Sequence, residues 1–251
     1  MDLSAYRGRG FPGDIDHAIA TTPVAGLDLV QARSQLRLAP ETEPLLYGTP
    51  PSPIRYRPGA RPALERVVAA LPAAGGREFA VAANRWVSTH VVHPHHLPAR
   101  TPPDRALTEE QLIESGTGWC NEQSRVLVAL AAVRGIPGRL CFAVHANLRC
   151  GHTAVELFVD GGWALFDPTF AVRVELPDGR LAAAREIAGT ARTYADAAYR
   201  LPLARYYEKC QPHVEDYPGW RAADRPAVEE GGLLFTHLGF TDYQITGVLA
   251  G

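Results

Sequence analysis

Three short apolar segments, residues 139–145, 152–160 and 163–167, follow one another in the middle of this chain. They are rich in β-branched and aromatic side chains, as expected of β-strands. The last two are joined through Asp160-Gly161, a dipeptide that favours the type I′ turn of a two-residue hairpin. The sequence therefore predicts three antiparallel strands, with the register of the last two fixed by the turn.

This register places two titratable side chains on one side of the predicted hairpin. If the Asp-Gly pair forms the turn, Val159 pairs with Gly162, and Asp167 stands opposite Ala154. Because side chains alternate along a strand, Asp167 and His152 become diagonal neighbours, roughly 7–8 Å apart at the backbone. A hydrogen bond from imidazole to carboxylate would fix the ring tautomer and leave the second ring nitrogen for another group.

A helix of about four turns is predicted just before these strands, with Cys120 in or beside its first turn. Apolar residues recur at helical spacing along one stripe: Val126, Leu127, Leu130 and Val133. Polar residues lie away from that stripe: Asn121, Glu122, Ser124 and Arg125. Gly135 and Pro137 supply the signals that end the helix.

The start of this helix is a favourable place for an anionic sulfur. Its unpaired N–H groups and the positive end of the helix dipole lower the pKa of a thiol from its free value of roughly 8.5. The resulting thiolate attacks carbonyl carbon, and the same amides can hold an oxyanion. Cys120, His152 and Asp167 thus form a candidate catalytic triad.

A family resemblance rests on two runs, GWCNEQSRVLVALAAVRGIPGR and GHTAVELFVDGGWALFDPT. They resemble the transglutaminase-like core of the papain-like cysteine enzyme superfamily, over about residues 75–170. The resemblance implies an α+β fold in which a nucleophile-bearing helix packs on an antiparallel β-sheet. It implies that Cys120 is the nucleophile, His152 the general base and acid, and Asp167 the orienting carboxylate. An acyl-enzyme formed from an amide or thioester is implied as well, without a metal or other cofactor.

Several activities are compatible with this resemblance. The chain lacks the additional β domains and evident calcium loops of larger transglutaminases, which argues against protein crosslinking. A cysteine peptidase or amidase, an arylamine N-acetyltransferase-like enzyme and an inactive binding module remain alternatives. The acetyltransferases resembling this chain carry RGGxC before the cysteine, where this chain has GTGWC. The expected partners are an acyl donor (peptide, small molecule or carrier-bound) and an amine or water acceptor.

Other residues near the predicted triad receive weaker assignments. A second oxyanion donor is required, and we consider the Gln111 side chain and the Trp86 indole for this role. Trp86 could also line the acyl pocket, and Trp119 could shape its entrance. We predict that Glu156 pairs with Arg139 as a structural feature.

The remaining cysteines and a histidine cluster have no assigned chemistry. Four cysteines without metal-binding spacing predict free thiols, and we interpret three of them as packing residues: Cys141, Cys150 and Cys210. Cys150 could also be a second reactive thiol near His152. The run HVVHPHH, His90–His96, contains four imidazoles, but Pro94 interrupts helical pairing and no carboxylate joins it, so we expect a loop rather than a metal site.

Composition limits the remaining possibilities. The chain has 251 residues, is 46% hydrophobic and 21% charged, and carries a formal charge of −2 without a basic block, so a nucleic-acid partner is not expected. No apolar run is long enough to cross a bilayer or to act as a signal peptide, so we expect no membrane association and a cytoplasmic location.

We predict one compact domain with an extension at residues 1–64, a catalytic core at 65–175 and an extension at 176–251. Two helices are expected within residues 62–92, and Thr108–Gln111 has a capping-box sequence.

Overall fold

The computed structural model describes residues 36–38, 40, 42–72, 74–94, 97, 106–145, 150–187, 199–201, 233–235 and 237–242. The helices are α3 (Glu43–Tyr47), α4 (Pro62–Ala70), α5 (Gly76–His90), α6 (Glu109–Ser115), α7 (Cys120–Val133) and α8 (Ala184–Ile187). The strands are β1 (Leu36–Arg37), β2 (Gly138–His145), β3 (Cys150–Val159), β4 (Gly162–Asp167), β5 (Val172–Arg173), β6 (Tyr199–Leu201), β7 (Leu233–Phe235) and β8 (His237–Asp242).

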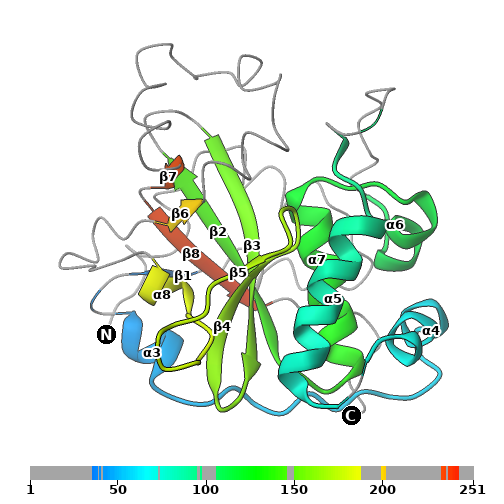
Figure 1. Ribbon diagram of the computed structural model, residues 1–251, viewed down its shortest axis with the longest axis horizontal. Coiled ribbons are helices and arrows are strands. Elements are labelled where there is room, and N and C mark those ends of the chain that lie inside the picture. The colour runs from blue at the N-terminus through cyan, green and yellow to red at the C-terminus, as the bar shows by residue number, and fades with distance from the viewer. Residues whose placement is uncertain are drawn as a thin grey trace.

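A sheet in the order β1-β8-β2-β3-β4-β5, antiparallel throughout, forms the centre of the molecule, and β6 and β7 form a separate pair. Helices α4–α7 lie on one side of this sheet and α3 and α8 on the other (Figure 1). The predicted α+β class, with the Cys120 helix packed on an antiparallel sheet, is confirmed. Strands β1 and β8 come from the two flanking segments, but the domain boundaries at 64/65 and 175/176 stay a prediction.

The local signals in the sequence are reproduced by the structure. Val159 pairs with Gly162, and Asp160 and Gly161 have φ values of 52° and 78°, as a type I′ turn requires. Thr108 and Gln111 form the predicted capping box at the start of α6. The Thr108 side chain accepts the Gln111 N–H, and the Gln111 side chain accepts the Thr108 N–H. Helix α7 ends before Gly135, whose φ of 72° is readily adopted by glycine.

The core lies between the sheet and helices α5 and α7. It contains alternate residues of the three central strands, which face the helices: Leu140, Phe142, Val155, Leu157 and Phe166. Gly138 permits β2 to approach α7 closely, because a Cβ there would lie 2.8 Å from Leu157 and 3.2 Å from Val128. Helix α7 is buried from Asn121 through Ala132, so its polar residues are buried together with its apolar stripe.

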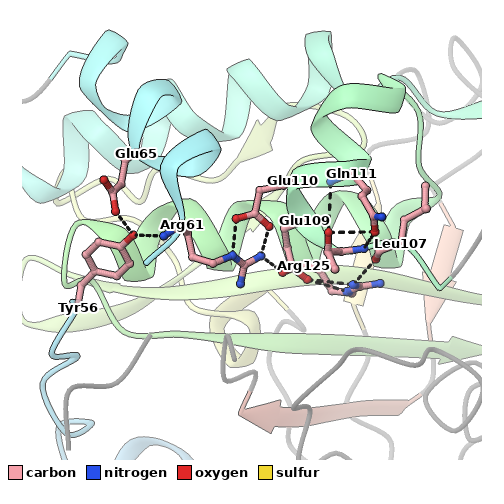
Figure 2. A network of polar contacts seen from close by, with 9 residues as sticks. Tyr56, Arg61, Glu65, Leu107, Glu109, Glu110, Gln111 and Arg125 are labelled. Atoms are coloured by element: carbon pink, nitrogen blue, oxygen red, sulfur yellow. Dashed lines mark hydrogen bonds and ion pairs between the residues drawn. The ribbon is translucent and has the colours of Figure 1, made fainter. Parts of the chain in front are cut away.

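Ion pairs accompany the buried polar side of α7 (Figure 2). Arg125 lies 2.9 Å from a carboxylate oxygen of Glu109 and donates a hydrogen bond to the Leu107 carbonyl. Arg61 joins Glu109 at 2.8 Å and also contacts Glu110, so the start of α4 is tied to α6. This network explains why a charged residue of α7 can be buried: its partner on α6 is buried with it.

On the other side of the sheet, a second buried ion pair joins β2 to β3. Arg139 and Glu156, which are Cα partners, approach to 2.6 Å, as the sequence predicted. The Arg139 guanidinium also lies 4.0 Å from the ring centroid of Trp163 and donates to the Leu46 carbonyl. The pair therefore anchors α3 to the sheet. Within the described part of the chain, no helix is long and apolar enough to span a bilayer.

Candidate active site

Cys120 is the first residue of α7, as predicted, and its side chain is half-buried. Trp119 occupies the N-cap position, and its side chain makes no capping hydrogen bond to this helix start. The first amides of a helix have no intrahelical acceptor, so the amide-rich end of α7 lies at the sulfur. The local electrostatic field therefore favours negative charge at Cys120.

His152 and Asp167 meet at the end of the β3–β4 hairpin. His152 Nε2 lies 2.7 Å from Asp167 Oδ2, and the carboxylate is fully buried. The ladder between the two strands runs from Val159–Gly162 to Val155–Phe166, the register expected from the turn. Because Nε2 faces the carboxylate, Nδ1 is the ring nitrogen left for a second partner.

That partner is Cys120, since its thiol forms a hydrogen bond with the His152 side chain. Burial raises the pKa of the Cys120 thiol, but His152 and the backbone N–H of Thr153 lower it by more, so the net pKa is below the ordinary value. Burial lowers the pKa of His152, but Asp167 and Cys120 outweigh this and raise it to about 10. The two shifts act in the same direction, toward a thiolate beside an imidazolium.

The backbone of Thr153 connects the nucleophile to β3. Its N–H donates to the Cys120 sulfur, and its carbonyl accepts a hydrogen bond of 3.0 Å from Ser124 Oγ. Ser124 lies one helical turn after Cys120, so the first turn of α7 is fixed to the residue that follows His152. The packing of α7 on the hairpin, which local sequence patterns do not specify, thus brings the three predicted residues together.

Two buried side chains extend this arrangement and were not predicted to be part of it. Thr169 donates its backbone N–H to Asp167 Oδ1 at 3.0 Å and its hydroxyl to Gln123 Oε1 at 2.8 Å. Gln123 Nε2 donates to the Val91 carbonyl at 2.7 Å. Helical spacing could have indicated Gln123, because it lies three residues after Cys120 and hence near the same side of α7.

The contacts described for the two proposed oxyanion donors are with residues other than Cys120. Gln111 is exposed, and its Oε1 accepts the Thr108 N–H at 2.9 Å within the capping box. Trp86 stacks on His90, with ring centroids 4.4 Å apart, and lines a pocket of about 650 Å³ along α5, whose lining does not include Cys120. Assigning the second oxyanion donor to either residue is therefore unsupported by the geometry.

Trp119 contacts His93 edge to face, with ring centroids 5.1 Å apart, and its role at an entrance stays a prediction.

The remaining cysteines and histidines divide into described and undescribed positions. Cys141 is a free thiol buried in the sheet, whose pKa is raised mainly by burial. Cys150 begins β3 but its side chain is outside the described part, as are Cys210, His95 and His96. Of the predicted cluster, His90 is exposed on α5 and His93 is buried. Among the described residues, no group of histidine, cysteine and carboxylate side chains could hold a metal ion.

Comparison with known proteins identifies the central segment. Residues 64–168 match the model of the transglutaminase-like superfamily, a cysteine-type catalytic fold. Among solved structures, a candidate cysteine protease from Cytophaga hutchinsonii is 19% identical, with a TM-score of 0.37; the alignment covers 58% of this chain and 46% of that one, less than half its length. A search of curated proteins found no match to the chain. The matched segment contains Cys120, His152 and Asp167, so the part of the chain that carries the candidate triad is the part similar to the transglutaminase-like superfamily.

Proposed function

We propose that this protein is a cysteine-dependent enzyme that transfers or hydrolyses the acyl group of an amide or thioester. The observation that carries the proposal is the hydrogen-bonded series Cys120–His152–Asp167, with the sulfur at a helix start and the carboxylate 2.7 Å from the far ring nitrogen. A purely structural cysteine needs neither a lowered thiol pKa nor a raised imidazole pKa, and this pair has both.

The first half of the proposed reaction forms an acyl-enzyme. The Cys120 thiolate attacks the carbonyl carbon, and the carbonyl π electrons move to oxygen, where the N-terminal amides of α7 stabilise the oxyanion. When the tetrahedral intermediate collapses, the C–N or C–S bond breaks, and the electron pair leaves with nitrogen or sulfur. The His152 Nδ1–H gives its proton to that leaving group. Cys120 then carries the acyl group as a thioester.

In the second half, the now neutral His152 accepts a proton at Nδ1 from water or an amine as either attacks the thioester. The C–S bond breaks, and the thiolate and imidazolium are restored. Asp167 keeps the proton on Nε2 throughout, so Nδ1 is the only ring position that exchanges protons. The same site therefore supports hydrolysis or transfer, depending on which acceptor reaches the thioester.

Intact-mass spectrometry tests the proposal. The protein is incubated with a panel of acyl-glutamine peptides, simple amides and acyl thioesters, and an adduct equal to the acyl group minus one hydrogen is sought. We expect the adduct in wild type and in Cys141→Ala, a matched loss of a buried thiol, but not in Cys120→Ala. Decay of the adduct is then compared with and without glycine methyl ester, which separates transfer from hydrolysis. An adduct that persists in Cys120→Ala would overturn the proposed nucleophile. So would iodoacetamide labelling of Cys120 no faster than that of glutathione at pH 6.5.

A further inference from the structure

A buried chain of polar groups links the candidate catalytic carboxylate to the helix that carries the nucleophile. It runs from Asp167 through Thr169 to Gln123, and each of these residues is at most 2% exposed. The chain ends at the carbonyl of Val91, just after α5. Three segments distant in sequence, the end of α5, the first turn of α7 and the turn after β4, are thereby held together.

The donors and acceptors in this chain can be arranged in only one direction. Gln123 donates its amide N–H to Val91, so its Oε1 acts as the acceptor and the Thr169 hydroxyl acts as the donor. That hydroxyl proton is therefore directed to Gln123, whereas Asp167 Oδ1 receives the backbone N–H of Thr169. The other oxygen, Oδ2, faces His152 Nε2. Donors at fixed positions on both oxygens set the plane of the carboxylate.

We propose that Gln123 and Thr169 are positioning residues for the Cys120–His152–Asp167 triad, an inference that rests on the proposed function. Thr169 sets the carboxylate plane through its N–H, and its hydroxyl fixes the turn after β4 to α7. Cys120 begins that same helix, so the Thr169–Gln123 hydrogen bond holds constant the separation of sulfur, imidazole and carboxylate. Catalytic hydrogen bonds tolerate little displacement, and a misplacement of about 1 Å can reduce a rate by about 100-fold.

A threonine after Asp-Pro could also serve only to shape a turn, and the two roles predict different results. Thr169→Val preserves the backbone N–H and nearly the same volume but removes the hydroxyl. If Thr169 only shapes the turn, this variant loses stability but leaves the thiolate–imidazolium pair unchanged. If Thr169 positions Asp167, its loss weakens the thiolate–imidazolium pair of Cys120 and His152. The pH at which Cys120 becomes reactive then rises toward that of a free thiol.

The experiment measures the rate of Cys120 alkylation by iodoacetamide from pH 5 to 10, by peptide mapping of the full-length protein. We expect Thr169→Val and Gln123→Met to slow alkylation at pH 6 by about 10-fold or more and to raise the acid-side midpoint, and Thr169→Ser to restore both. Because the two variants break one shared bond, the double variant should show less than the sum of the two effects. Thr42→Val is the control, since Thr42 is equally buried but precedes α3 across the sheet.

The outcomes separate this inference from the proposed function. A wild-type Cys120 that reacts like glutathione at every pH would remove the proposed function itself. A second outcome would overturn only the positioning role. In it, Cys120 of the wild type reacts already at low pH, and the alkylation profile of Thr169→Val matches that of the wild type or shifts no more than that of Thr42→Val. If Thr169→Val does not fold, Thr169→Ser and Gln123→Met decide the question. A Gln123→Met protein with the alkylation midpoint of the wild type contradicts the inference. A raised midpoint in Gln123→Met, together with a wild-type midpoint in Thr169→Ser, supports it.

Discussion

Replacing Asp167 by asparagine tests the electrostatics of the site directly. The substitution keeps the size of the side chain but removes the charge that lies 2.7 Å from His152 Nε2. Both charges are spread over several atoms, so we take an average separation of about 4 Å. At an effective dielectric constant of about 20, that pair is worth roughly 4 kcal/mol, which corresponds to a change of about 3 in pKa. We therefore expect the pKa of His152 to fall from about 10 to about 7.

The direction of the accompanying change in chemistry follows from hydrogen-bond geometry. The asparagine oxygen can still accept the Thr169 N–H, which leaves its NH₂ group facing His152 Nε2. Two donors cannot bond to each other, so the variant favours the neutral ring with its proton on Nδ1. In that tautomer Nδ1 cannot take a proton from Cys120. The fraction of thiolate at neutral pH should fall together with the pKa of His152.

Long-range ¹H–¹⁵N NMR on histidine-labelled protein measures this pKa. The chain has nine histidines, so the His152 signal is identified by its loss in His152→Gln. Asp160→Asn is the matched control, because it removes the same charge from the same hairpin at an exposed position where asparagine accepts the positive φ. We expect its His152 to titrate like that of wild type. A His152 that still titrates near 10 in Asp167→Asn would refute the assignment of Asp167 as the main stabilising charge.

Three further predictions concern the framework of the site and use urea unfolding as the measurement. Glu156→Gln leaves the buried charge of Arg139 without its carboxylate and should destabilise the protein by about 3–5 kcal/mol; a loss below about 1 kcal/mol would contradict the role of this pair. Gly138→Ala places a methyl group against β3 and α7 and should cost about 1–3 kcal/mol, whereas Gly179→Ala, which meets no atoms but has a positive φ, serves as a comparison for strain alone. Thr108→Ala removes the capping box of α6 and should cost about 1 kcal/mol without changing Cys120 alkylation.

The parts of the site that the sequence predicts correctly are those set by local rules. A two-residue turn leaves one register for the hairpin, so counting from Asp160-Gly161 was sufficient to predict that Asp167 and His152 meet. The start of α7 at Cys120 also follows from a local pattern. The family resemblance adds the expectation that these two units pack together. Periodicity alone does not contain that information.

The parts that were missed depend on packing between distant segments. The polar side of α7 looks like a solvent-facing surface in the sequence, but it is buried because Arg125 finds Glu109 on α6 and Gln123 finds Thr169 and Val91. Gln111 is the converse case. Its place on the helix before Cys120 suggested a catalytic donor, whereas the capping box already predicted from the sequence accounts for its side chain.

These differences indicate which structural unit constrains the chemistry more strongly. If β4 shifted by one residue along β3, His152 and Asp167 would lie on opposite sides of the sheet, because side chains alternate with every residue. A small shift of α7 along its axis would instead change the sulfur–imidazole distance gradually. The hairpin can thus be fixed by its own turn, but the helix position needs tertiary contacts. Ser124 with Thr153, and Gln123 with Thr169, are contacts of this kind, and both lie within about one turn of Cys120. The chemistry of Cys120 therefore depends on buried polar residues of α7 as much as on the triad itself.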